Sequence, residues 1–189
     1  MKKKAMLVGV LIAIVAWNLY RANNAFGAQN SLNSDMTLTS SAFKDFGFIP
    51  ADYGCSDLGK ENPIPPLSWK SIPPHTKTFA LICEDPDDGR DPFVHLIIFN
   101  ISSTVRGWPK GADLSEYGII GKNDGNVHLR GYHPLCPPTG VHRYFFTLYA
   151  LNTTLDLDAN ATKFDLIKAM DGHILATAQL VGRYSKKSI

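Results

Sequence analysis

Three stretches of the chain are almost continuously apolar and end at turn-forming residues: 78–84, 93–101 and 143–151. They are rich in isoleucine, leucine, valine, phenylalanine and tyrosine, residue types that favour β-strands. Because apolar residues occupy nearly every position rather than every second one, the pattern indicates central strands covered on both faces. The chain is therefore predicted to be β-rich.

Helical periodicity is convincing in one segment, residues 162–170. There Phe164, Ile167 and Met170 recur at helical spacing and define one apolar face of the predicted helix. Residues 118–131 are rich in glycine and asparagine and are predicted to form a loop. The polar residues 29–40 predict a loose leader or a first edge strand. Together these elements predict one α+β domain over residues 29–189.

The N-terminal residues differ in character from the rest. Three lysines, Lys2 to Lys4, precede an apolar stretch at 5–17, and small residues follow at 25–28. This order is typical of a secretory signal, here residues 1–28, with cleavage expected after Gly27 or Ala28. The apolar stretch is shorter than the ~20 residues of a membrane-spanning helix. The alternative is an uncleaved anchor over residues 5–20. The expected location is therefore the periplasm or the exterior, or a membrane reached only through this segment.

The charge balance changes once that segment is set aside. The whole chain has 19 Lys and Arg against 17 Asp and Glu. Lys2, Lys3, Lys4 and Arg21 lie in the leader, which leaves 15 basic and 17 acidic residues and a net charge of −2. No basic patch or zinc-finger spacing points to nucleic acid, so a nucleic-acid partner is not expected.

Three cysteines follow the leader, and an oxidising compartment allows only one pair among them. Cys83 lies in a predicted core strand and is interpreted as a small buried apolar residue. Cys55 and Cys136 both lie in loops and form the possible disulfide, provided that their Cα atoms approach within ~7 Å. No C-x-x-C spacing suggests zinc, and neither a metal nor a cofactor is expected.

The most distinctive segment is 131–144, in which prolines stiffen a loop that leads directly into a strand. Such a loop places His142, Arg143 and Tyr144 at the start of the strand. This arrangement is typical of a pocket wall that contacts a polar, anionic ligand. The alternative is a surface turn whose histidine and arginine are simply solvated.

A second polar set lies upstream, where Asp85 and Asp87 end one predicted strand and His95 stands near the start of the next. A buried imidazole costs free energy unless it is hydrogen-bonded. These carboxylates are the expected partners of His95. The alternative is a core histidine satisfied elsewhere.

Taken together, the two segments resemble the signature regions of the phosphatidylethanolamine-binding protein family, most closely its bacterial and archaeal Raf-kinase-inhibitor-like branch. The first signature, DPD followed by a strand with H-x-x-x-x-N, is matched by Asp85, Asp87, His95 and Asn100. The second, which ends in P-P-x-G-x-H-R-Y, is matched at 137–144. Segments 53–69 and 175–184 are similar to further parts of the family, so the resemblance extends from about residue 40 to residue 184.

The resemblance implies a large central β-sheet packed on a smaller one with peripheral helices, including a short second helix at 174–180. It implies a small-anion site, for a phosphate or a phospholipid head group, lined by a set of residues from both signatures: Asp85, Asp87, His95, Cys136, Pro137, His142 and Tyr144. Within that set Asp87 is expected to hold the loop. Arg143 is expected to pair with Asp85 or Asp87, because adjacent strand residues point to opposite faces.

Two departures from the family's pattern fall beside this site. Pro134-Leu135 stands where the family has Gly-Pro, and proline has no backbone N–H to offer an anion. Either that donor is lost, or Leu135 or Cys136 supplies one. Asp88-Gly89 replaces the family's Ala-Pro and adds a charge and a flexible joint.

Three classes of function fit these residues. The first is a binding module for small anions, phospholipid head groups or phosphorylated partners. The second is a modulator of another protein, such as a kinase- or protease-like enzyme, as the resemblance implies. The third is a hydrolase that uses Asp85, Asp87, His95 and His142 with a metal or by acid–base chemistry. Because no activated-nucleophile motif is present, a non-enzymatic binding protein is the preferred expectation, with no catalytic residues assigned.

Overall fold

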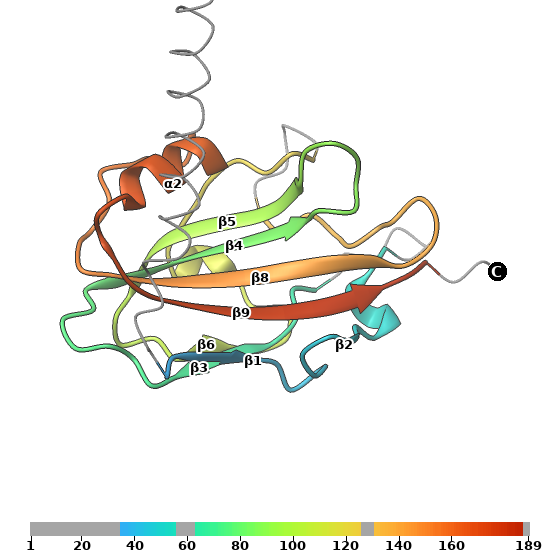
Figure 1. Ribbon diagram of the computed structural model, residues 1–189, viewed down its shortest axis with the longest axis horizontal. Coiled ribbons are helices and arrows are strands. Elements are labelled where there is room, and N and C mark those ends of the chain that lie inside the picture. Colours follow the sequence, from blue (N-terminus) through green and yellow to red (C-terminus); the bar gives the residue numbers. More distant parts are fainter. Residues whose placement is uncertain (1–34, 56–62, 126–130, 187–189) are drawn as a thin grey trace, which may run out of the picture. The chain divides into compact units, whose positions relative to one another are not determined.

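The computed structural model describes residues 35–55, 63–125 and 131–186, which form two β-sheets, one α-helix and two short 3₁₀ turns (Figure 1). The expected leader, 1–28, and the alternative anchor, 5–20, lie outside the described residues. No helix in the described part of the chain has both the length and the apolar character needed to cross a bilayer.

The larger sheet has the strand order β2-β9-β8-β4-β5-β7. Its strands are β2 (Gly47–Phe48), β4 (Thr78–Asp85), β5 (Phe93–Ser102), β7 (Ile119–Ile120), β8 (His142–Leu151) and β9 (Ile174–Tyr184). The three predicted strands are confirmed as β4, β5 and β8, and β4 lies between the other two with antiparallel pairing on both sides. The predicted loop at 118–131 does contain one short strand, β7, because two isoleucines there pair with the edge of β5.

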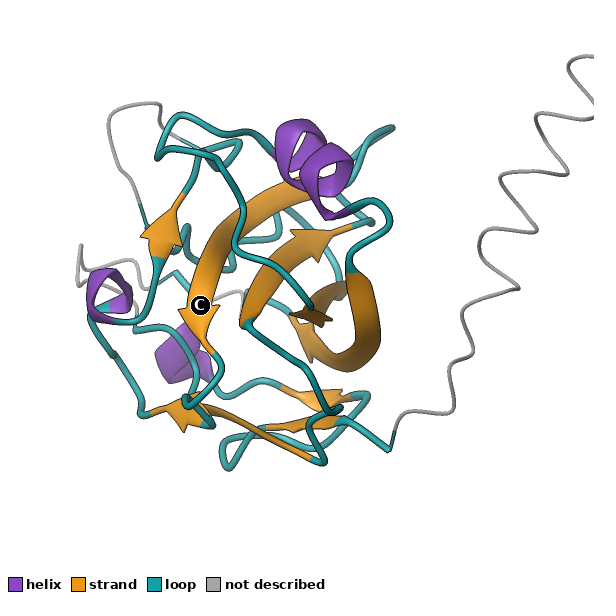
Figure 2. Cartoon of the chain, turned by 90° about the vertical axis from the view of Figure 1, so that its left-hand side faces the viewer, coloured by secondary structure: helices purple, strands orange, loops and turns teal. Residues whose placement is uncertain are grey.

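The smaller sheet consists of β1 (Thr37–Thr39), β3 (Leu67–Lys70) and β6 (Gly107–Trp108), with β3 in the middle. Of the two alternatives for residues 29–40, the edge strand is therefore found over residues 37–39. Figure 2 shows the two sheets as separate layers. Between them lies the main core, in which Trp69 of β3 packs edge-on against Phe79 of β4 at 5.7 Å between ring centroids.

The outer face of the larger sheet is covered by α2 (Lys163–Met170). The helix begins with a capping box, in which Thr162 and Asp165 each bond the other's backbone N–H. Its buried residues are Leu166 and Met170, which pack on apolar side chains of β4 and β5. The predicted apolar face is therefore wrong for Phe164 and Ile167, which are 74% and 48% exposed. The sequence offers two adjacent apolar stripes, and only the position of the helix on the sheet selects between them.

The second helix implied for 174–180 is also wrong, because these residues belong to β9. β9 pairs with β8 along nearly its whole length, and its side chains alternate between buried and exposed. Ala176, Ala178 and Leu180 face the core, whereas Thr177 and Gln179 face outward. Alanine, leucine and glutamine favour helices, but pairing with a neighbouring strand overrides this weak preference. The two-sheet architecture implied by the resemblance is confirmed.

Candidate functional site

The polar residues of both signature segments meet at one end of the larger sheet. Asp85 ends β4, His142 begins β8 and His95 lies near the start of β5. Because β4 runs antiparallel to both of its neighbours, its last residue lies beside their first residues. Strand order alone therefore brings together side chains that are up to 57 residues apart in the sequence.

A β-bulge in β5 decides which way His95 points. Glu84 is opposite Val94 and Cys83 is opposite Leu96, so His95 is the extra residue between the two pairs. Val94 belongs to the core on the outer face, whereas Leu96 belongs to the core between the sheets. The bulge thus places two consecutive side chains, His95 and Leu96, toward the inner face, where Tyr144 also lies.

Asp85 is the electrostatic centre of the site and is only 2% exposed. One of its carboxylate oxygens accepts a hydrogen bond from Nδ1 of His142 at 2.7 Å. The other accepts a hydrogen bond from the backbone N–H of Asp87 at 2.8 Å. A buried carboxylate requires such partners, and these two bonds give each of its oxygens a donor.

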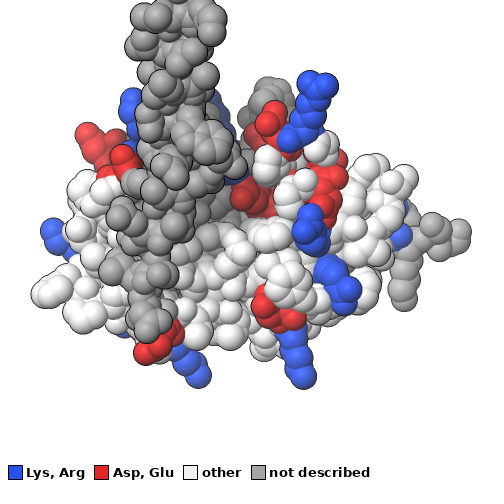
Figure 3. Space-filling view, in the orientation of Figure 1, with Lys and Arg blue, Asp and Glu red and all other residues white. Residues whose placement is uncertain are grey.

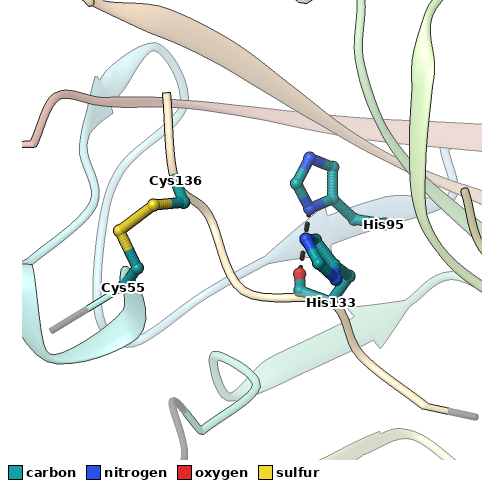
Figure 4. Close-up of a disulfide and its surroundings, with 4 residues drawn as sticks. All are labelled: Cys55, His95, His133 and Cys136. Carbon is teal, nitrogen blue, oxygen red and sulfur yellow. Dashed lines mark hydrogen bonds between the residues drawn. A yellow bond between two sulfur atoms is a disulfide. The ribbon is translucent and has the colours of Figure 1, made fainter. Parts of the chain in front are cut away.

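His95 does not bond a carboxylate, so the expectation that Asp85 or Asp87 is its partner is wrong. Its Nδ1 lies 2.9 Å from the carbonyl oxygen of His133. Figure 4 marks this hydrogen bond with a dashed line. The backbone N–H of His133 donates in return to the carbonyl oxygen of His95, also at 2.9 Å. The loop that carries His133 runs alongside β5, so its backbone carbonyl, and not a carboxylate, lies within hydrogen-bond distance of the His95 ring. Asp85 is instead occupied by His142.

Burial is the main reason why the pKa of His95 falls to about 4, and the ring is consequently neutral near pH 7. The ring is enclosed by other rings: it lies 4.8 Å from Phe93, 5.6 Å from His133 and 5.2 Å from Tyr144, centroid to centroid. An apolar and aromatic enclosure disfavours the charged imidazolium.

His133 and Phe93 are the site residues that sequence reasoning missed. The His133 ring packs on Phe93 at 5.3 Å, and burial lowers the pKa of His133. A side chain on Gly125 would collide with this ring, so a glycine is required there. The position of His133 within the distinctive 131–144 segment is a sequence signal that could have pointed to it. Its contact with β5 has no such signal, because that contact depends on the path of the loop.

Tyr144 is fully buried, and its hydroxyl has no hydrogen-bond partner among the described residues. The hydroxyl lies near the Asp85 carboxylate. Burial and, after it, the negative charge of Asp85 raise the pKa of Tyr144. Because a buried polar group without a partner is costly, this hydroxyl is a natural point for an ordered water or a ligand oxygen.

Asp87 and Arg143 form a separate pair at the margin of the site. The guanidinium donates two hydrogen bonds to the carboxylate, at 2.9 and 2.6 Å, and the backbone N–H of Arg143 donates a third at 2.9 Å. Of the two partners expected for Arg143, the structure thus selects Asp87. The pair holds the turn after β4 against the start of β8.

We expect replacement of Asp87 by asparagine to change the acid sensitivity of folding. The hydrogen bond from the Arg143 guanidinium is the first cause that lowers the pKa of Asp87 from 3.8 to about 2. A depressed carboxyl pKa adds stability above about pH 4, and this contribution is lost as pH falls toward 2. Urea unfolding at several pH values should therefore show the wild type and D87N converging between pH 4 and pH 2.

The matched control is Arg143→Gln, which removes the other partner and should give the same flattened dependence. The double variant should differ little from either single variant. A wild-type advantage that stays constant from pH 4 to pH 2 would contradict the assigned role of this pair.

The proline-rich turn is held from outside by a disulfide between Cys55 and Cys136, the pair considered from the sequence (Figure 4). Their Cα atoms are 5.2 Å apart. Leu135 is fully buried and forms a parallel β-bridge with Gly54, and its carbonyl accepts the N–H of Cys55. Pro137 is buried and Cys136 is exposed.

This turn has few backbone donors. Pro134, Pro137 and Pro138 have no N–H, and Leu135 is engaged in the bridge with Gly54. Cys136 is therefore the only residue from 134 to 138 with an N–H outside that bridge. Within the described ranges, no group of three or more His, Cys, Asp or Glu side chains is arranged to hold a metal ion.

The fold and the site define a two-sheet protein whose polar side chains cluster where β4 ends and where β5 and β8 begin. A family model for the phosphatidylethanolamine-binding protein matches residues 39–185. The chain belongs to this family.

Relatives and solved structures agree with this assignment. A UPF0098 protein of Methanothermobacter thermautotrophicus is 44% identical over 155 residues, which cover 80% of this chain and 99% of the relative. A UPF0098 protein of Chlamydia trachomatis is 41% identical over 159 residues, with the same coverage.

Two crystal structures have the same fold. That of the phosphatidylethanolamine-binding protein homologue CT736 of Chlamydia trachomatis has a TM-score of 0.74 and 39% identity, and the match covers 82% of this chain and 99% of that one. That of E. coli YbcL, described as a member of the mammalian family, has a TM-score of 0.71 and 28% identity, covering 81% and 99%.

Proposed function

We propose that this protein is a non-enzymatic binding protein whose site takes a small oxyanion of the phosphate type, either free or as the head group of a lipid or phosphorylated partner. One observation carries the proposal: Asp85, His95, His142 and Tyr144 converge from three neighbouring strands on one face. Two of them, His95 and His142, make no protein hydrogen bond through Nε2 within the described residues. The enclosed Tyr144 hydroxyl also lacks a partner there.

Binding accounts for these groups better than hydrolysis does. Asp85 and His142 form the kind of pair that also serves acid–base catalysis. A hydrolase of that type needs a nucleophile hydrogen-bonded to the imidazole. Among the described residues, no Ser, Thr or Cys side chain has such a bond to His142. The metal-assisted alternative lacks a gathered ligand set in the same part of the chain.

Two further features support the expected location and partners. A disulfide that closes the loop beside the site is typical of oxidising compartments, which supports a periplasmic or secreted protein. On the face seen in Figure 3, acidic and basic side chains are interspersed rather than gathered by sign. This face has no continuous basic patch of the kind that binds a polyanion, which supports a small ligand over a nucleic acid.

The test is binding of phosphate and phosphoethanolamine at millimolar concentration, followed by the imidazole NMR signals of His95 and His142. We expect both rings to shift on titration. Tyr144→Phe removes only the unpaired hydroxyl, so the fold should be kept and binding should weaken severalfold, by about one hydrogen bond. Tyr149→Phe, on the outer face of the same strand, is the control and should bind as the wild type does. Unchanged imidazole signals in the wild type would refute the proposal.

A further inference from the structure

The hydrogen bonds made by the two site histidines determine which ring nitrogen carries the proton. A carbonyl oxygen can only accept, so the bond from His95 to the carbonyl of His133 requires a proton on Nδ1 of His95. The Asp85 carboxylate likewise accepts from Nδ1 of His142. A neutral imidazole carries one proton. The neutral His95 ring therefore presents a lone pair, not an N–H, at Nε2.

The rest of the site supplies few donors. Three of the five residues from 134 to 138 are prolines and Leu135 is engaged with Gly54, which leaves the N–H of Cys136. The guanidinium of Arg143 is committed to Asp87. The Tyr144 hydroxyl can donate one hydrogen bond. A fully deprotonated anion would thus meet, at Nε2 of His95, a lone pair where it needs a further donor.

The charges around the two rings act in the same direction. His95 is faced by Asp85 from β4, by Asp88 from the following turn and by His133 from the loop. His142 is faced by Asp85, by Asp87 of that turn and by Tyr184, the residue of β9 that pairs with it. These carboxylates repel a dianion more strongly than a monoanion.

We propose that the site selects oxyanions that carry their own proton, so that a P–OH group of the ligand donates a hydrogen bond to Nε2 of His95. A dianion then binds only together with one proton taken from solvent. This inference rests on the proposed anion-binding function and adds to it the protonation state of the ligand. Burial, which lowers the pKa of His95 to about 4, keeps that ring in its lone-pair form across the neutral range.

Methyl phosphate and methyl sulfate are matched probes for this inference. Singly protonated methyl phosphate and methyl sulfate have the same charge and nearly the same shape, but only the phosphate has an O–H. The second pKa of a phosphomonoester is about 6. Calorimetric titrations of the full-length protein at pH 6 and pH 7.5, the latter in two buffers of different ionisation enthalpy, measure both the affinity ratio and the protons taken up.

At pH 6 we expect methyl phosphate to bind at least about 10-fold more tightly than methyl sulfate, the effect of one hydrogen bond to a charged partner. At pH 7.5 we expect about one proton to be taken up for each methyl phosphate bound. Equal affinities together with no proton uptake would overturn the inference and leave the anion-binding function intact. If neither probe binds, the proposed function fails, and this inference fails with it.

His95→Gln tests the role of the ring directly, because the glutamine amide can donate an N–H at the place of Nε2. We expect this variant to bind methyl sulfate more tightly and to reduce the affinity ratio to about threefold or less. Should this variant not fold, the proton uptake of the wild type still tests the inference. The control is His173→Gln at an exposed position, where the ratio should be unchanged. An unchanged ratio in the His95→Gln variant would overturn the assignment to Nε2 of His95.

Discussion

Replacing Cys55 and Cys136 together by serine is expected to lower the free energy of unfolding by about 4 to 5 kcal/mol. The disulfide joins residues 81 positions apart, and a loop of this length removes a large conformational entropy from the unfolded chain. This loss is a large part of the total, since a protein of this size has a free energy of unfolding of about 5–15 kcal/mol. Guanidinium unfolding of the oxidised wild type and the double variant measures the difference.

The unpaired cysteine provides the control. Cys83 is fully buried and does not take part in the disulfide. Cys83→Ala should keep the stability difference between oxidised and reduced protein, whereas the double serine variant should be indifferent to reductant. A loss below about 1 kcal/mol in the double variant would mean that the disulfide contributes little and that the β-bridge between Gly54 and Leu135 already holds the turn.

Replacing Asp85 by alanine is expected to cost about 3–5 kcal/mol and to abolish anion binding. The carboxylate is buried and accepts bonds from His142 and from the backbone of Asp87. Its removal leaves both donors without partners in a nearly dry environment, which is far more costly than the loss of an exposed ion pair. Denaturant unfolding gives the stability change, and titration with phosphate gives the change in binding.

Asp85→Asn is the matched comparison, because its amide oxygen can still accept one of the two hydrogen bonds, whereas its amide nitrogen is a donor and replaces the other acceptor. We expect it to lose less stability than the alanine variant, about 1–3 kcal/mol, the cost of one buried donor left without a partner. It removes the negative charge beside His142 and Tyr144 at the same time. If the alanine and asparagine variants were equally stable, the hydrogen bonds accepted by Asp85 would not contribute to the stability of the fold.

Much of the architecture could be predicted because its signals are local. The central strands were found from continuous apolar runs bounded by turn residues, a pattern that depends only on neighbours in the sequence. The helix at Lys163–Met170 was found from periodicity, but its buried face was not. The helix expected at 174–180 rested on the family resemblance alone, and the two-residue alternation of β9 is only weakly visible in the sequence.

For the site, the sequence supplied the residues but not their pairing. Asp85, His95, His142 and Tyr144 were recognised from two ordered motifs. The partner of His95 was not, because it depends on a bulge that adds one residue to β5 and on a loop that arrives from 131–134. The sequence also suggested His95 as the partner of Asp85, whereas the structure pairs Asp85 with His142. Which histidine lies within hydrogen-bond distance of the carboxylate depends on the register of three strands.

By itself, the sequence determined the family, the two-sheet class, the central strands and the set of polar residues that gather at one end of the sheet. These follow from local composition and from motifs whose order along the chain is unambiguous. Only the tertiary structure decided that His95 bonds the His133 carbonyl and that His142 bonds Asp85. These bonds determine which ring nitrogen carries the proton. That difference follows from strand register and loop path, which arise from the packing of the whole domain and leave no local trace in the sequence.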